Sequence, residues 1–374
     1  MEPTMIESVR IRGFRSLANV ELSEIPKAAV LIGANGSGKS NFIRFFEMLS
    51  WMLGSRRLAE FVEMQGGADD QLYGGSRRTS RIEAEVRLRT ETGRYGYDYQ
   101  FMLSHAHPDR FFFSEESFRS ISDLSWKYLG SGHQETEIIW PTNPSSEFSA
   151  DDFITAKVIV DLLRSCVVYQ FHDTSDTSDF KKRGDAEDNN SLLSHGGNLA
   201  AVLLRLERED IKRYERICQH ISRILPVFDR FQIEESYGKV LLRWKAKWTD
   251  KTFGAHLTSD GSLRFFSLVT LLNLPPEMLP DVLLLDEPEL GLHPAAVALI
   301  GGMIKSLAEE RQVIVATQSP LLVDEFGLDE IFVLELQDGR TEFRKLSPDD
   351  YQVWLDDNFT SGELWQKNLL GGRP

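Results

Sequence analysis

A glycine-rich loop near the N-terminus constrains the fold of this chain more than any other feature. It follows Ala28-Ala29-Val30-Leu31-Ile32, a continuous apolar run that is typical of a buried strand. Apolar residues at helical spacing come after the loop, from Phe42 to Met52. The loop itself reads Gly33, Ala34, Asn35, Gly36, Ser37, Gly38, Lys39 and Ser40, with Asn41 next. A strand, this loop and a helix together match the phosphate loop of nucleotide-binding α/β proteins.

The residue types of the loop indicate the chemistry of the site. Glycines allow backbone N–H groups to turn toward phosphate oxygens at the start of a helix. Lys39 is expected to reach the β and γ phosphates and to act in catalysis, and the Ser40 hydroxyl is expected to bind Mg²⁺. We therefore predict that residues 33–41 bind ATP, with Mg²⁺ as the second cofactor.

A second element carries two carboxylates at the end of another buried run. Val282-Leu283-Leu284-Leu285 predicts a central strand, and Asp286 and Glu287 follow it directly. Asp286 is expected to hold Mg²⁺, while Glu287 is expected to orient and deprotonate the attacking water. The alternative is an acidic strand end that caps a helix, because Pro288 and Glu289 come next.

Composition excludes several classes of protein. The chain has 374 residues and two cysteines, Cys166 and Cys218, in dissimilar contexts, which argues against a disulfide framework or a zinc site and favours a reducing cytoplasm. No apolar run approaches the length of a membrane span, and the N-terminus lacks the apolar segment of a signal peptide. The net charge of −15 argues against a surface that is basic throughout, but it leaves a local basic groove for nucleic acid open.

The order of the expected elements predicts an α/β fold. Strand, helix and strand alternate over residues 282–316, which is typical of a parallel sheet. Residues 81–89 and 95–103 alternate as an antiparallel hairpin, and residues 199–225 have helical spacing, as one bent helix or two. We expect a mixed or parallel central sheet, an N-terminal antiparallel β subdomain and a mainly helical insertion.

Four segments follow from this reading. Residues 1–104 are expected to form the N-terminal lobe of an ATPase head, and residues 240–345 its C-terminal lobe. Residues 105–239 are expected to form an inserted β/helical subdomain with mobile polar loops, and residues 346–374 a helical tail. Residues 130–151 are expected to be a loop, and the almost entirely polar residues 172–190 are the candidate for a mobile segment.

Three stretches resemble the ABC-type, AAA-family ATPases of the RecF, SMC (chromosome-structuring) and OLD (overcoming lysogenisation defect) group. The first runs from Leu285 to Pro294, with the sequence LDEPELGLHP, and the second from Ile11 to Leu17, which includes Arg15. Thr258 to Arg264 stands in the place of the ABC signature. The resemblance covers roughly residues 5–104 and 240–345, and the middle of the chain matches only loosely.

This resemblance implies that ATP lies between two heads. Ser259 and Gly261 would approach the γ-phosphate held by the other copy, and Arg15 would contact the nucleotide of its own head. The alternative for residues 259–261 is an ordinary Ser-Asp-Gly turn that caps a helix.

The chain departs from the family in two places. Gln318 stands where ABC proteins often have a switch histidine; it can hydrogen-bond the γ-phosphate or the water, but it does not titrate near neutral pH. For the glutamine that usually follows the phosphate-loop helix, Gln71 is the candidate and Gln65 is close behind, with a plain loop as the alternative.

The expected function is that of an ATPase without its own effector, since only about 55 residues follow Gln318, too few for the nuclease domain of OLD proteins. The first hypothesis is a homodimer that closes on ATP and engages DNA or a separate effector protein such as a nuclease, in DNA repair or anti-phage defence. The second is a barely hydrolysing scaffold that regulates a partner. A small-molecule kinase is disfavoured by the Asp286-Glu287 pair and the signature.

Overall fold

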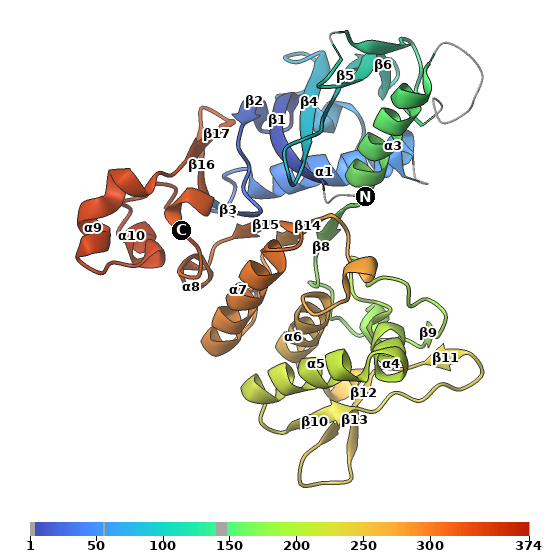
Figure 1. Ribbon diagram of the computed structural model, residues 1–374, viewed down its shortest axis with the longest axis vertical. Coiled ribbons are helices and arrows are strands. Elements are labelled where there is room, and N and C mark those ends of the chain that lie inside the picture. The colour runs from blue at the N-terminus through green and yellow to red at the C-terminus, as the bar shows by residue number, and fades with distance from the viewer. Residues whose placement is uncertain (1–3, 55–56, 124, 140–147, 374) are drawn as a thin grey trace.

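The computed structural model describes residues 4–54, 57–123, 125–139 and 148–373. The fold is α/β, with two sheets of six strands and two small sheets. In Figure 1 the large antiparallel sheet lies in the upper lobe, helices dominate the lower lobe, and the strands of the central sheet cross the molecule between them. The predicted fold class is confirmed.

The central sheet holds the two expected buried strands near its middle. Its strands, in spatial order, are β17 (Arg340–Lys345), β16 (Ile331–Gln337), β3 (Ala28–Ile32), β15 (Gln312–Thr317), β14 (Val282–Asp286) and β8 (Cys166–Tyr169). All pairs are parallel except β16 with β17. Every residue of β3, β14 and β15 is buried, as a strand covered on both faces requires. The carboxyl ends of these three strands therefore meet at one edge.

An antiparallel sheet packs over the phosphate-loop helix. Its strands, in spatial order, are β2 (Leu17–Leu22), β1 (Thr4–Phe14), β4 (Arg81–Thr90), β5 (Gly96–Ala106), β6 (Arg110–Ser120) and β7 (Lys127–Gly130). Its alternate residues join one core with α1 (Lys39–Leu53) and α3 (Ala150–Arg164). The short α2 (Leu58–Met64) follows α1. The sheet continues past residue 104 because β5, β6 and β7 pair in sequence, so residues up to 130 belong with the N-terminal lobe.

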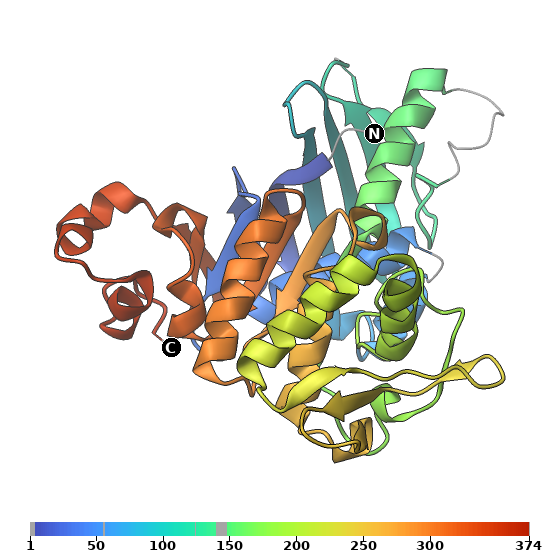
Figure 2. The same cartoon turned by 60° about the horizontal axis from the view of Figure 1, so that its bottom comes forward.

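The lower lobe contains the helical part of the expected insertion. The structure has two helices where one or two were predicted, α4 (Leu199–Glu209) and α5 (Ile211–Ile224), with Asp210 as the cap of the second. They pack with α6 (Asp260–Leu271) and α7 (Pro294–Ala308). The lobe's short strands are β9 (Gly184–Asp185), β10 (Phe228–Phe231), β11 (Lys239–Val240), β12 (Arg243–Ala246) and β13 (Thr252–Gly254). Figure 2 shows these helices beside the central strands.

Strand β8 does not belong to a separate insertion, because it pairs with β14 in the central sheet. The C-terminal segment forms α8 (Pro320–Val323), α9 (Gln352–Asp356) and α10 (Ser361–Gln366), and Trp365 is fully buried there. Part of the polar segment predicted as a loop, residues 140–147, lies outside the described residues. Among the helices that the structure describes, none is long and apolar enough to cross a membrane.

Candidate nucleotide site

The phosphate loop depends on glycine at defined positions. Gly36 and Gly38 have φ angles of 79° and 107°, which side chains rarely adopt. A Cβ on Gly38 would lie 2.0 Å from Thr341 Oγ1, and one on Gly33 would lie 2.4 Å from the carbonyl oxygen of Leu334. Strands β16 and β17 thus press against the loop, and only glycine fits there.

Lys39 is buried inside the loop that it serves. Its Nζ donates to the carbonyl oxygens of Gly33 at 2.6 Å and of Ala34 at 3.1 Å. Burial lowers the pKa of Lys39, whereas the nearby carboxylates, Glu287 foremost, act in the opposite direction. The buried Ser37 Oγ has no hydrogen-bond partner among the described residues, which fits a cradle shaped for an anion. Ser40, the first-turn residue expected to bind Mg²⁺, is exposed.

Asp286 ends β14, two strands away from β3 in the sheet. Its Oδ2 accepts a hydrogen bond of 2.7 Å from Gln170 Nε2, while its buried Oδ1 has no partner in the described part of the chain. Burial, followed by the charge of Glu287, raises the pKa of Asp286. A buried carboxylate oxygen without a donor fits a cation, because Mg²⁺ prefers carboxylate and water oxygens.

Glu287 and Gln318 lie on neighbouring strand ends and contact each other. Gln318 Nε2 donates to Glu287 Oε1. Glu287 has a φ of 48°, an uncommon conformation for glutamate, and its N–H donates to the Ala316 carbonyl at 2.8 Å. Glu289 Oε1 accepts from Thr317 Oγ1 at 2.6 Å and from the Gln318 N–H at 3.0 Å. The acidic residues do not cap α7, which begins at Pro294 with His293 as its cap.

Gln170, which contacts Asp286, is the site residue that the sequence analysis missed. Gln71, the candidate from the sequence, forms its hydrogen bonds elsewhere. Gln71 is fully buried: its Oε1 accepts from Arg15 Nε at 3.0 Å, and its Nε2 donates to the carbonyls of Gln65 and Gly67. Its side chain is therefore used within its own loop. The sequence does show a polar residue, Gln170, directly after the apolar run of residues 166–169. It does not show that this strand pairs with β14 in the central sheet.

Arg15 and Asn41 each form hydrogen bonds with residues outside the phosphate loop. The Arg15 guanidinium also donates to Gln65 Oε1 at 3.1 Å. Asn41 Nδ2 donates to Ser16 Oγ at 2.8 Å, and Ser16 Oγ lies 2.7 Å from Thr341 Oγ1. The contacts of Asn41 and Ser16 link the start of α1 to the turn between β1 and β2 and to β17.

The signature residues lie at the start of α6 in the lower lobe. Ser259 caps this helix and accepts from the Ser262 N–H at 3.3 Å. Gly261 packs so tightly that an added Cβ would lie 2.5 Å from the Gly291 carbonyl oxygen. Arg264 joins α6 to the segment after β14 by donating to the Leu290 carbonyl at 3.1 Å. Among the described residues, neither Ser259 nor Gly261 forms a hydrogen bond with residues 33–41.

A hollow of about 210 Å³ opens beside this helix start. Its lining comes from the end of α5, the start of α6 and the segment before α7, and it includes Ser259, Gly261, Gly291, Leu292 and His293. The signature therefore borders a surface that is free within one copy of the described chain.

A family profile and several curated proteins resemble this chain in sequence. The family profile described as "AAA domain, putative AbiEii toxin, Type IV TA system" matches residues 28–161 and 167–324. The DNA replication and repair protein RecF of Anaeromyxobacter dehalogenans strain 2CP-C is 42% identical over 69 residues, which is 18% of either chain. RecF of strain 2CP-1 is 38% identical over 95 residues, 23% of this chain and 26% of that protein. The matches thus span about a quarter or less of the RecF proteins.

Solved structures show the same fold over nearly the whole chain. The SmcHead bound to the C-winged helix domain of ScpA has a TM-score of 0.61 at 16% identity, covering 93% of this chain and 99% of that one. The Smc head domain from Pyrococcus furiosus, bound to the C-terminal domain of ScpA, has a TM-score of 0.57 at 16% identity, with coverage of 95% and 99%. Because the profile matches more than half of its residues, this chain belongs to that AAA-domain family, and its fold is that of the Smc heads.

Proposed function

We propose that this chain is a Mg²⁺-dependent ATPase whose active site is completed between two copies of the chain. The observation that carries the proposal is the convergence at one edge of the central sheet: Lys39 follows β3, Gln318 follows β15, and Asp286 and Glu287 end β14. A phosphate cradle beside two carboxylates is the arrangement that phosphoryl transfer to water requires.

Each residue has a separate role in this proposal. The N–H groups of residues 33–41 and the Lys39 ammonium hold the phosphates, and Arg15 contacts the nucleotide. Ser40, Asp286 and Gln170 hold Mg²⁺, which neutralises phosphate charge when it is bound. Glu287 accepts the proton of the attacking water, and Gln318 orients both the Glu287 carboxylate and that water.

The second copy supplies Ser259 and Gly261. The start of α6 presents amide groups that stabilise negative charge, but the described chain brings no phosphate site of its own to them. The hollow at their side is where the partner's nucleotide would dock. We therefore propose a homodimer with ATP between its subunits.

The names of the similar proteins suggest what ATP binding controls. RecF is a DNA replication and repair protein, the Smc heads were solved with ScpA, and the family description names a toxin–antitoxin system. We propose that closure of the dimer engages DNA or a separate effector protein such as a nuclease, in DNA repair or anti-phage defence. The two cysteines of the chain are free, buried thiols, and reduced thiols fit the cytoplasm.

One contact favours the second candidate, a scaffold that hydrolyses ATP slowly. The Gln318 amide donates to the Glu287 carboxylate, so that carboxylate is already engaged by a neighbouring side chain at the position where it would accept the proton of water. Gln318 cannot take up a proton itself.

A phosphate-release assay with and without duplex DNA separates the two candidates. The first predicts steady turnover that Glu287→Gln abolishes while ATP stays bound and the closed dimer accumulates. The second predicts ATP-dependent dimers with almost no phosphate release from the wild type. Wild-type turnover by Glu287→Gln would contradict the assignment of Glu287, and no ATP binding at all would contradict both.

A further inference from the structure

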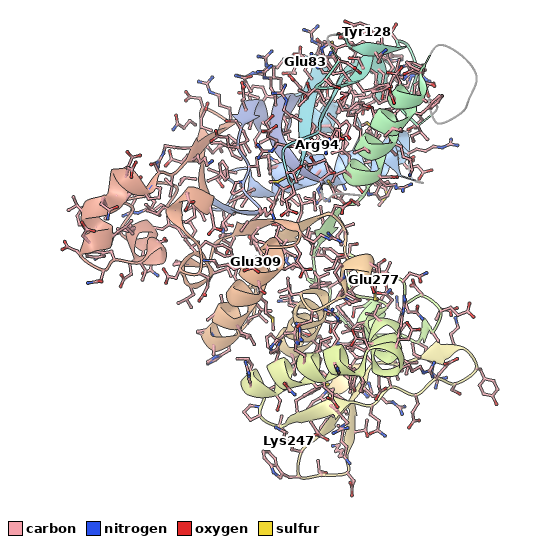
Figure 3. All side chains as sticks on the ribbon, in the orientation of Figure 1. Glu83, Arg94, Tyr128, Lys247, Glu277 and Glu309 are labelled. Carbon is pink, nitrogen blue, oxygen red and sulfur yellow. The ribbon has the colours of Figure 1, made fainter. Side chains whose placement is uncertain are left out.

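The lower lobe contains a basic surface that the nucleotide site does not use. Residues 211–253 include ten Lys or Arg and five Asp or Glu, a net charge of +5 in a chain whose net charge is −15. The hairpin of β12 and β13, residues 243–254, carries four Lys or Arg and one Asp, and β10 lies beside it. Lys247, which Figure 3 labels, lies at the far end of this lobe from the antiparallel sheet.

Strand alternation places the cations on one face of the small sheet. Trp244 and Ala246 are buried, while Arg243, Lys245 and Lys247 occupy the alternate positions. Lys245 is paired across the strands with Arg230, so that neighbouring strands present like charges. Like charges in register are unfavourable unless something else neutralises them, which points to an anionic partner.

The carboxylates near this face compensate only part of the charge. Asp250 lies 3.3 Å from Lys245 Nζ and Asp229 lies 3.5 Å from Arg230 Nε, in ion pairs that water screens. Arg243 has no ion pair within the described chain. Arg223 near the end of α5 is exposed, and Lys247 Nζ donates to the neighbouring Ser222 Oγ at 2.6 Å, which extends the basic surface onto α5.

An aromatic side chain stands at the tip of this basic hairpin. Trp248 is 86% exposed, with a φ of 63° that the turn imposes. The exposed indole directly follows Lys247, so an aromatic face and cations are presented at the same place. Indole rings stack on unpaired bases, and cations beside them hold the phosphates between those bases.

We propose that Trp248 and the basic face formed by Arg230, Arg243, Lys245 and Lys247 bind single-stranded nucleic acid. The phosphates lie along the outer face of β10 and β12, and one base stacks on the Trp248 indole. Stacking requires an unpaired base, so a blunt duplex contacts only the cations.

This surface is joined to the proposed dimer interface. Trp244 Nε1 donates to Thr258 Oγ1 at 2.9 Å, and Thr258 directly precedes Ser259. The relation to ATP rests on the proposed function, but the binding itself does not. Binding is therefore measured without nucleotide, so that the failure of one proposal leaves the other standing.

The experiment measures the fluorescence anisotropy of a labelled 30-nucleotide oligothymidine with the full chain over a series of salt concentrations. Trp248→Ala should weaken binding about tenfold, the loss expected for one stacked base. Arg243→Glu with Lys245→Glu should weaken binding and reduce the slope of log affinity against log salt by about 1.4. Oligouridine in place of oligothymidine tests whether ribose or deoxyribose changes the affinity. Trp248→Ala should not change the affinity for a blunt duplex, because its bases are paired.

Two matched controls keep the test specific. Tyr237 is an equally exposed aromatic at another turn, 102% exposed, and Tyr237→Ala should bind like the wild type. Lys157→Glu with Arg164→Glu removes two exposed cations from α3 in the other lobe and should also bind like the wild type. The proposal is overturned if the wild type does not bind the oligonucleotide, if Trp248→Ala binds as the wild type does, or if the control variants lose as much affinity.

Discussion

At the scale of single residues, Lys39 forms hydrogen bonds within the phosphate loop that contacts to ATP phosphates are expected to replace. Lys39 Nζ donates to two carbonyl oxygens of the loop, so its ammonium has hydrogen-bond partners within the loop itself. Lys39→Ala should reduce ATP affinity by about 10- to 100-fold or more, because a charge-assisted contact to phosphate is lost. Calorimetric titration with ATP measures this, with Lys157→Ala on the exposed face of α3 as the control. Unchanged affinity in Lys39→Ala would place the nucleotide elsewhere.

The buried carboxylate of Asp286, which is proposed to bind a cation, lowers the stability of the folded protein when it is charged. Its pKa in the folded protein is raised by burial, so the neutral form is favoured on folding, and stability is lost as the pH rises from the unfolded pKa through the folded one. Asp286→Asn should therefore stabilise the nucleotide-free protein at pH 8, and by less as the pH falls toward 5. Thermal unfolding between pH 5 and pH 8 measures this. A destabilised variant at pH 8 would contradict the argument, whereas Mg²⁺-dependent ATP hydrolysis should be lost in either case.

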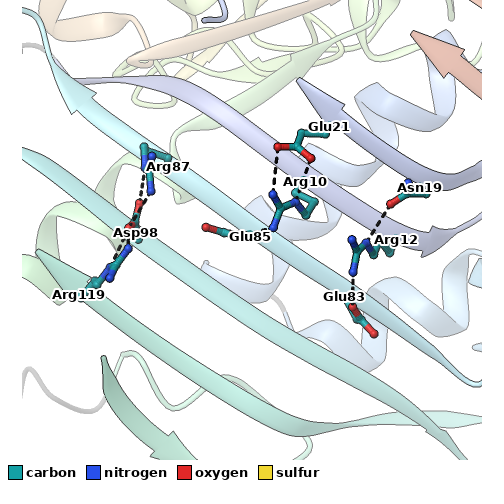
Figure 4. A network of polar contacts seen from close by, with 9 residues as sticks. All are labelled: Arg10, Arg12, Asn19, Glu21, Glu83, Glu85, Arg87, Asp98 and Arg119. Atoms are coloured by element: carbon teal, nitrogen blue, oxygen red, sulfur yellow. Dashed lines mark hydrogen bonds and ion pairs between the residues drawn. The ribbon is translucent and has the colours of Figure 1, made fainter. Parts of the chain in front are cut away.

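At the scale of elements, the exposed face of the antiparallel sheet is organised by ion pairs across its strands. Asp98 on β5 is buried between Arg87 on β4 and Arg119 on β6, at 2.7 Å from each guanidinium (Figure 4). Arg10 links β1 to Glu21 on β2 and Glu85 on β4 in the same way. The sheet needs this register because its opposite face covers α1.

Removing the central carboxylate should weaken the sheet. Asp98→Asn should destabilise the protein by about 1–3 kcal/mol, because two guanidinium groups lose their shared partner. Glu21→Gln removes an exposed carboxylate from the same face and should leave the free energy of unfolding nearly unchanged, because water screens exposed ion pairs. Urea unfolding of both variants measures the difference, and equal effects would show that burial of Asp98 adds nothing.

At the scale of the whole molecule, two lobes carry complementary halves of the proposed site. The phosphate loop follows β3 in the central sheet, and Ser259 begins α6 in the lower lobe. Ser259→Arg should bind ATP almost normally yet fail to hydrolyse it, since a bulky cation at this helix start blocks docking of the second copy.

Mixing two inactive variants tests the shared site directly. In a mixed dimer of Ser259→Arg and Lys39→Ala, one composite site has both defects and the other has neither. Phosphate release should therefore reappear on mixing, to part of the wild-type rate. Full activity of Ser259→Arg alone would reject the role of the signature and leave residues 259–261 as a helix cap.

The sequence by itself determined the parts of the site that are continuous in the chain. The strand, glycine loop and helix at residues 28–53 lie where the pattern predicts them, and so do the buried run and the Asp286-Glu287 pair. Local chemistry is sufficient here, because apolar runs specify buried strands and glycine specifies the positive φ angles of the loop.

Only the tertiary structure decided which distant residues meet. Gln170 lies 116 positions from Asp286, and it reaches Asp286 because β8 pairs with β14, an order that no local pattern of either strand contains. Gln71 was the candidate from the sequence for the glutamine of the family, yet the structure buries it among Arg15, Gln65 and Gly67. The physical reason is that strand order in a parallel sheet is set by crossover connections and by the packing of whole helices against the sheet, so the residues gathered at its carboxyl edge are known only once the chain has folded.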